Sequence, residues 1–435
     1  MNRSMRAVLG VAAAATLALA GCTSEVNQVQ EEPFPTGPVE ISLAGWSFAS
    51  TPEFQTLADG FHALHPNVTV KLVEYDAAQY DTLLAADLAA SKAPDVYILK
   101  NLKNFYTYQS NGQLKDVSDI AAKLPAETGG LDNYKVNGKA YAVPYRQDSW
   151  VLYYNKDLFD KAGVKYPDGT WTWDDYVATA KELTTKLSPN AKGTYEHSWQ
   201  STVQGFALAQ TPGAQIDSGD FSWAKPYYQR ALDLQNSGAQ ETLGSITTNK
   251  LGYQAQFGTQ KAAMLPMGTW FVAKLLAGQA KGDYPNFSWG IAPAPQFDKS
   301  TTGTNNTPVT FGDPTGLGLN AAISDNTTFT VAKEFIRYAA GVEGGKALAG
   351  IGITPANTTD EVASIYFAKG APTDDLSKFA WGKHKTLPEN PVTKYTTQIQ
   401  NILGGMHTAI LTNSKSVDEA IAEAQNKAKN EVLNQ

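Results

Sequence analysis

The chain has 435 residues, a formal net charge of -7 at pH 7, a hydrophobic fraction of 42% and a single cysteine. A negative surface disfavours nucleic acid and anionic lipid as partners, and one cysteine excludes a disulfide framework. We therefore expect an ordinary globular protein of about two or three domains that is held together by its hydrophobic core.

The first residues indicate a secretory signal rather than part of the fold. Arg3 and Arg6 precede an apolar run at 8–20, which is too short to span a bilayer comfortably. The run ends in the four residues 19–22, Leu-Ala-Gly-Cys, which are similar to a bacterial lipobox.

We predict a signal peptide at 1–21, lipidation of Cys22 and a flexible, proline-containing tether at 22–38. The alternative for Cys22 is a buried free thiol. No later segment has the roughly 20 uninterrupted apolar residues that a membrane span needs. A lipid on Cys22 is therefore the only membrane attachment that we predict.

Strand and helix patterns alternate at the start of the globular part. Alternating apolar residues predict strands at 39–43 and 68–72, and a third strand follows at 95–99. Apolar residues at helical spacing predict helices at 54–64 and 80–88. This order of elements implies a mostly parallel sheet covered by helices.

The middle of the chain changes character where two strand-like runs flank Arg146-Gln147-Asp148. We place a first crossing between domains there, a second at 289–295 and a third near 320–325. These crossings predict an N-terminal lobe of residues 39–147 plus 294–322 and a C-terminal lobe of residues 148–293 plus 323–435. The chain ends in a helix that Ser416 and Glu419 open as a capping box.

Several short motifs follow one another in order along the chain. They are the strand leading to Trp46, His65-Pro66-Asn67-Val68, Ala93-Pro94-Asp95-Val96, 137–144, 153–159, 171–176, 258–264 with 268–270, and the tail at 416–428. Together they resemble the family 1 extracellular solute-binding proteins of bacterial ABC importers, the group that includes maltose-binding protein. One departure is Ser91-Lys92-Ala93-Pro94, where the family often has a glycine before the proline; this affects a turn only.

The resemblance implies an α/β fold of the type II-like periplasmic-binding-protein class. In this class two lobes, each a mostly parallel sheet flanked by helices, are joined by a hinge of crossing strands. The resemblance also implies an extracytoplasmic monomer without a cofactor, which binds a neutral mono- or oligosaccharide between the lobes. It would then deliver the saccharide to the permease subunits of an ABC importer.

A saccharide presents C–H faces that an aromatic ring can cover and hydroxyl groups that need hydrogen-bond partners. Open α/β sheets bind ligands beyond the carboxyl ends of their strands, so loops after strand-like runs supply the candidates. They are Trp46, Ser47, Lys100, Asn101, Arg146, Gln147, Asp148, Trp270, Gly312 and Asp313, with Trp223 and Trp199 from a less regular stretch.

Four of these candidates have a second interpretation. Trp270, where the resemblance places a sugar-stacking tryptophan, is otherwise a core or interlobe tryptophan. Asp148, which aligns with a ligand-contacting carboxylate of the family, is otherwise a salt-bridge partner of Arg146. Trp46 can instead cap the sheet edge, and Asp313 can instead form its own turn.

The charged candidates are few and of mixed sign. Arginines such as Arg146 and Arg230 are isolated, whereas an acidic sugar or a phosphate would call for clustered arginines. The pattern therefore favours a neutral ligand over an anion.

Other functions are less consistent with the sequence. A secreted glycosidase needs two carboxylates that face each other across a cleft, but Asp174 and Asp175 are adjacent, and Thr172 with Asp175 predicts a helix start. The five histidines are scattered without the spacing of a metal site. An adhesin would not need aromatic loops at strand ends. A binding protein for a non-sugar solute stays open as an alternative.

Overall fold

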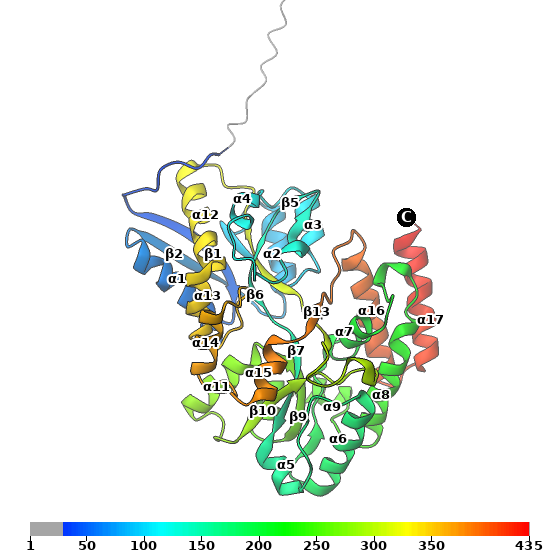
Figure 1. Cartoon of the computed structure of the whole chain (residues 1–435). Helices are drawn as coiled ribbons and strands as arrows, with labels where there is room; N and C mark the ends of the chain where they lie inside the picture. The colour runs from blue at the N-terminus through cyan, green and yellow to red at the C-terminus, as the bar shows by residue number, and fades with distance from the viewer. Residues whose placement is uncertain (1–28, 435) are drawn as a thin grey trace, which may run out of the picture.

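The computed structural model describes residues 29–434, which form two α/β lobes joined by crossing strands (Figure 1). The fold class predicted from the sequence is confirmed. The predicted signal peptide at 1–21 and the predicted lipidation of Cys22 lie outside the described residues.

The N-terminal lobe contains a five-stranded sheet in the order β2-β1-β3-β12-β6. Strand β1 is parallel to β2 and β3, and β12 is antiparallel to both of its neighbours. The elements of this lobe are β1 (Val39–Trp46), α1 (Glu53–Leu64), β2 (Val68–Tyr75), α2 (Tyr80–Ala89), β3 (Val96–Leu99), α3 (Phe105–Ser110), α4 (Ser118–Ala121), the hairpin β4 (Lys135–Val136) and β5 (Lys139–Ala140), β6 (Val143–Gln147), β12 (Pro314–Leu319), α12 (Asn326–Ala340) and α13 (Val342–Ala349).

The C-terminal lobe contains a four-stranded sheet in the order β10-β7-β9-β8 and a small parallel pair, β11 with β13. Strand β7 is antiparallel to β10 and β9, and β8 is parallel to β9. The elements of this lobe are β7 (Trp150–Asn155), α5 (Lys156–Ala162), α6 (Trp173–Leu187), β8 (Lys192–Thr194), α7 (Ser201–Gln210), α8 (Lys225–Asn236), α9 (Leu243–Thr248), α10 (Tyr253–Gly258), β9 (Ala262–Gly268), α11 (Phe271–Lys281), β10 (Trp289–Pro293), β11 (Val309–Phe311), α14 (Asp360–Ala368), α15 (Asp375–Gly382), β13 (Lys385–Leu387), α16 (Thr396–Leu411) and α17 (Val417–Ala428).

One strand in each sheet runs against the others, β12 in the N-terminal lobe and β7 in the C-terminal lobe. Both directly follow a crossing from the other lobe. The remaining strands run toward the junction of the lobes, whereas a strand that enters from the other lobe starts there and runs away. The carboxyl ends of the remaining strands therefore gather at the junction.

Two separate hydrophobic cores define where the chain crosses. One core includes buried residues from Ile41 to Tyr145 and from Leu317 to Ile353. The other includes buried residues from Trp150 to Phe311 and from Val362 to Val432. We call the connecting residues 147–149, 312–313 and 354–359 the hinge.

The predicted second and third crossings are therefore misplaced. Residues 294–311 belong to the C-terminal core, because Ala294 and Phe311 are buried there. Helix α12 packs against β1, β6 and α1, and its apolar residues Val331, Phe335 and Ile336 complete the N-terminal core. The polar stretch at 320–325 is a loop within one lobe rather than a link between two.

The predicted tether at 22–38 is also only partly correct, because its described part packs on the N-terminal lobe. Val29 and Phe34 contact the N-terminal core. Glu31 forms ion pairs with Lys333 at 2.7 Å and with Arg337 at 2.5 Å on α12. Residues 29–34 are thus part of the lobe.

Local sequence signals place several helix starts correctly. Thr172 with Asp175 caps α6, and Ser416 with Glu419 caps α17, each as a full capping box. Asp174 and Asp175 thus belong to the first turn of a helix and do not face each other across a cleft. Within residues 29–434, none of the helices combines the length and apolar character needed to cross a bilayer.

Candidate functional site

Loops from both lobes meet beside the hinge. In the N-terminal lobe β1 leads into Ser47 and β3 into Lys100, and in the C-terminal lobe β8 leads into 195–200 and β9 into Thr269. These loops lie beyond the carboxyl ends of their strands, where open α/β sheets bind ligands.

A cavity of about 380 Å³ lies between the lobes at this place. Its volume falls within the roughly 300–1,000 Å³ of typical small-molecule sites. The N-terminal lobe contributes Asn101 and Lys103. The C-terminal lobe contributes Ser198, Trp199, Gln200, Ser201, Glu389, Asn390, Gln400, Gly404, His407 and Thr408. The lining is mostly hydroxyl and amide groups beside one indole ring, one imidazole, one amine and one carboxyl.

Tryptophans form the aromatic wall of the C-terminal lobe. Trp199 is 41% exposed, and its ring packs against Trp150 and Trp270 with ring centroids 6.5 Å and 6.4 Å away. Trp270 is half-buried, and its Nε1 donates a hydrogen bond to the Tyr253 hydroxyl at 3.2 Å. Its ring covers Gly268, where a Cβ would lie 1.9 Å from the indole. Trp199 is therefore the more exposed of the two indoles and lines the cavity, whereas Trp270 packs against Trp199 and is not among the lining residues.

The N-terminal lobe has a smaller aromatic surface at Trp46. This ring is half-buried and packs edge-on against Phe54 and Tyr80, each with a centroid distance of 5.1 Å. The Nζ of Lys100 lies 5.0 Å from the Trp46 ring centroid, and burial lowers the pKa of this lysine. Ser47 occupies the left-handed region with φ of 51° and turns the chain after β1. These three candidates thus lie together, but none lines the cavity.

Asp148 and Arg146 belong to a buried ion network in the hinge. Arg146 donates from Nη1 to Glu53 Oε2 at 2.5 Å and from Nη2 to Asp148 Oδ2 at 2.6 Å. The other oxygen of Asp148 accepts a hydrogen bond from the Thr269 hydroxyl at 2.8 Å. Asp148 therefore forms the salt bridge with Arg146. Neither residue is among those that line the cavity.

Asp313 accepts hydrogen bonds from both lobes at the hinge. Its carboxylate accepts hydrogen bonds from the backbone N–H groups of Leu102 at 3.1 Å, Glu389 at 2.8 Å and Asn390 at 3.2 Å. It also accepts one from the side-chain amide of Asn390 at 2.6 Å. Leu102 is in the N-terminal lobe and Asn390 in the C-terminal lobe, so Asp313 links the two lobes.

Gly312 and Gln147 fix the two crossing strands to each other. A Cβ at Gly312 would lie 2.1 Å from the carbonyl oxygen of Asp148, so any larger residue would push the strands apart. The Gln147 amide donates hydrogen bonds to the carbonyl oxygens of Asp148 at 3.1 Å and Gly312 at 3.4 Å. Both candidates therefore have a structural role in the hinge.

Trp223 lies apart from the other candidates, as a core residue of the C-terminal lobe. It is 8% exposed and its ring packs near Phe221, which places it in the core rather than in the cavity wall. Arg230 is likewise buried, paired with Glu196 at 2.6 Å and lying 4.1 Å from the Trp173 ring centroid. The guanidinium group of Arg230 is thus paired with the buried carboxylate of Glu196.

Three titratable groups of the cavity are absent from the sequence-based candidates. Burial lowers the pKa of Lys103 and lowers that of His407 to about 4. Burial raises the pKa of Glu389 to about 7, and the neighbouring carboxylate of Asp313 adds to this shift. The one local signal is that Glu389 and Asn390 stand between two prolines, which is typical of a loop.

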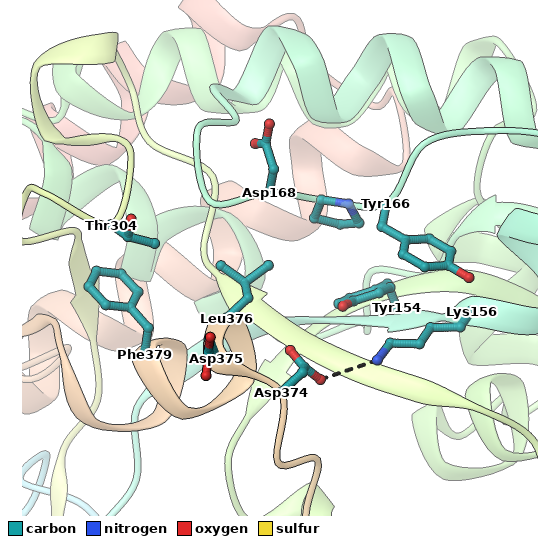
Figure 2. Close-up of a pocket in the computed structure, with 10 residues that line it drawn as sticks. Tyr154, Lys156, Tyr166, Asp168, Thr304, Asp374, Asp375, Leu376 and Phe379 are labelled. Carbon is teal, nitrogen blue, oxygen red and sulfur yellow. Dashed lines mark hydrogen bonds and ion pairs between the residues drawn. The ribbon is translucent and has the colours of Figure 1, made fainter.

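A larger hollow of about 640 Å³ lies on the C-terminal lobe alone. Figure 2 shows the rings of Tyr154 and Tyr166 close together there, and Lys156 paired with Asp374 at 3.1 Å. A ligand in this hollow would contact one lobe only and could not link its binding to movement between lobes. The interlobe cavity is therefore the candidate site. Among residues 29–434, no group of three His, Cys, Asp or Glu side chains is arranged to hold a metal ion.

Comparisons with known proteins agree on one family. The family model described as bacterial extracellular solute-binding protein matches residues 45–346. A solved structure of a sugar transporter from Rhizobium etli, in an open conformation, is 30% identical and covers 90% of this chain and 99% of its own, with a TM-score of 0.75.

Two curated relatives show the same likeness at lower identity. The melibiose/raffinose/stachyose-binding protein MelE of Bacillus subtilis is 23% identical over 377 residues, 81% of either protein. A putative binding protein of Brucella abortus is 25% identical over 279 residues, which are 62% of this chain and 66% of that protein.

Proposed function

The chain belongs to the bacterial extracellular solute-binding proteins, and from that membership we propose that it is the saccharide-binding component of a bacterial ABC importer. It holds a neutral mono- or oligosaccharide in the interlobe cavity and delivers it to the permease subunits. It works outside the cytoplasm as a monomer, anchored to the cell membrane through a lipid on Cys22.

The observation that carries the proposal is the composition of the cavity wall. An exposed indole, Trp199, stands beside hydroxyl and amide groups from both lobes. An indole face covers the C–H face of a sugar ring, and the amides and hydroxyls can bond its hydroxyl groups. The relatives named after sugars support the same ligand class.

The cavity also supports binding without catalysis. A glycosidase needs a second carboxylate across from the first, and Glu389 is the one carboxyl residue in the lining. The nearest acid partner, Asp313, already accepts four hydrogen bonds from N–H groups and holds the hinge. These features support our proposal that the protein recognises its ligand without transforming it.

Thermal unfolding of the purified chain with and without melibiose, raffinose and stachyose tests the proposal. A saccharide that binds only the folded protein at 100 times its dissociation constant stabilises it by about 2.7 kcal/mol, so at least one of them should raise the melting temperature. Trp199→Ala should remove the shift. Phe297→Ala is the matched control, because Phe297 is 53% exposed and lies outside the cavity.

A shift with an amino acid or a metal ion and with no carbohydrate would overturn the proposal in favour of a non-sugar solute. Hydrolysis of a saccharide during the experiment would instead favour the glycosidase alternative.

A further inference from the structure

Glu389 holds a fixed position in the cavity wall, and its side chain makes no hydrogen bond to the hinge residues within residues 29–434. Its backbone N–H donates to Asp313 and its carbonyl oxygen accepts a hydrogen bond from the Gln400 amide at 3.0 Å. The hydroxyl of Ser201 donates to Glu389 Oε1. The backbone is therefore fixed from two sides, and one carboxyl oxygen has a protein donor.

The other carboxyl oxygen, Oε2, has no hydrogen-bond partner within residues 29–434, and the side chain lines the cavity. The wall around it is polar: Ser201 and Gln200 adjoin it on one side, and Lys103 contributes from the opposite lobe. The Lys103 amine is itself held by the Asn401 side chain at 2.8 Å. Glu389 thus presents a polar atom to whatever fills the cavity.

Glu389 and the neighbouring Asp313 form a pair of interacting acids. Burial is the largest effect on Asp313 and raises its pKa above the ordinary value, although the four N–H donors that bond its carboxylate act in the opposite direction. Glu389 has a single hydroxyl donor, and burial beside Asp313 raises its pKa to about 7. The two acids therefore share one region of the protein, where a proton on either of them limits the repulsion between their carboxylates.

We propose that Glu389 is the specificity-determining residue of the cavity, bonding a hydroxyl group of a neutral saccharide and rejecting saccharides that carry a carboxylate or phosphate. The inference rests on the proposed function and extends it by naming the excluded ligand class. A hydroxyl group can donate to the Glu389 oxygen or accept from its proton. An anionic group at the same place would face two acids at close range, and the single amine of Lys103, shared with Asn401, does not offset both.

The test compares melibiose with the melibiose derivative whose galactose C6 is oxidised to a carboxylate. Titration calorimetry on the full chain should show that the wild type binds melibiose at least about tenfold more tightly than the derivative, which corresponds to about 1.4 kcal/mol. Glu389→Gln removes the negative charge and keeps the shape of the side chain, so the preference for melibiose over the derivative should narrow to threefold or less. Glu389→Ala should weaken melibiose by about tenfold, because a hydrogen bond is lost.

The pH profile provides a second readout. The other titratable groups at the cavity are Asp313, Lys103 and His407, and they are present in both the wild type and Glu389→Gln. The preference of the wild type for melibiose over the carboxylate derivative should grow from pH 6 to pH 8, because Glu389 loses its proton in this range. The same preference of Glu389→Gln should not change. Glu361→Gln is the matched control, because Glu361 is an exposed acid paired with Lys346 outside the cavity.

The outcomes separate this inference from the proposed function. If melibiose binds and Trp199→Ala abolishes binding, but both Glu389 variants keep the wild-type preference, then Glu389 does not determine specificity and the inference fails alone. If the wild type binds the carboxylate derivative as tightly as melibiose, the inference is also overturned. If the wild type binds no saccharide at all, both proposals fail.

Discussion

Removing Arg146 should destabilise the protein strongly, because this side chain neutralises two buried acids. Arg146 contacts Glu53 at 2.5 Å and Asp148 at 2.6 Å, and the three side chains are 7%, 0% and 6% exposed. Removing one partner of a buried ion pair costs about 3–5 kcal/mol, since the remaining charge is uncompensated. Arg146→Met leaves two such carboxylates, so we expect a loss at the upper end of this range.

Urea unfolding followed by tryptophan fluorescence measures the free energy of unfolding. The matched control is Lys135→Met, which removes a cation from an exposed pair with Asp132 at 2.7 Å. An exposed pair contributes only about 0–1 kcal/mol. Replacing all three charged groups, as Glu53→Gln, Arg146→Met and Asp148→Asn, should recover part of the loss, because no unpaired charge remains. A loss for Arg146→Met within 1 kcal/mol of the control would refute the reasoning.

The remaining predictions concern the hinge, a buried histidine and the N-terminal segment. Gly312→Ala should destabilise the protein by about 1–3 kcal/mol through overpacking. The control Gly405→Ala in α16 has nothing within 4 Å of the new Cβ and should stabilise the protein by about 0.5–1 kcal/mol. Equal melting temperatures of the two variants would contradict this prediction. Burial lowers the pKa of His407 from 6.5 to about 4, so the unfolded chain takes up a proton between these values while the folded chain does not. The contribution of His407 to the free energy of unfolding should therefore fall by up to about 3 kcal/mol as pH drops from 6.5 to 4. His407→Gln should reduce the slope in urea titrations, and His197, whose pKa burial also lowers to about 4, should keep part of it. Lys333→Met should cost about 1–2 kcal/mol and increase amide exchange in residues 29–34, because Glu31 loses an ion-pair partner; unchanged exchange would show that the segment is held otherwise.

Local patterns in the sequence predicted local structure well. The alternating strand at the start of the fold and the capping boxes at Thr172 and Ser416 depend on neighbouring residues, which the sequence displays directly. The positions of the crossings between lobes cannot be predicted locally, because they depend on which of the two sheets a helix from a distant part of the chain covers. Helix α12 has an ordinary apolar stripe that fits either lobe by pattern alone, and only the packing of Phe335 and its neighbours assigns it to the N-terminal core.

The candidate site was predictable only where it follows a strand. Asn101 and Trp199 come from loops after β3 and β8 and do line the cavity. Glu389 and His407 come from a loop and helix near the end of the chain, and nothing local distinguishes them from surface residues. For Asp148 the spacing to Arg146 fits an ion pair and a ligand contact equally, and the buried partner Glu53 comes from a different helix.

The packing of residues 29–34 on α12 sets which half of the molecule is held when the protein is immobilised. Anything attached ahead of Val29, such as a bead, a fluorophore or a bilayer anchor, is mechanically coupled to the N-terminal lobe through Glu31 and its two basic partners. Any movement between the lobes would then be a movement of the C-terminal lobe relative to the attached group. The distance between such an attachment and a probe on α17 would change with the angle between the lobes. The distance to a probe on α12 would not change, because α12 belongs to the same lobe as residues 29–34.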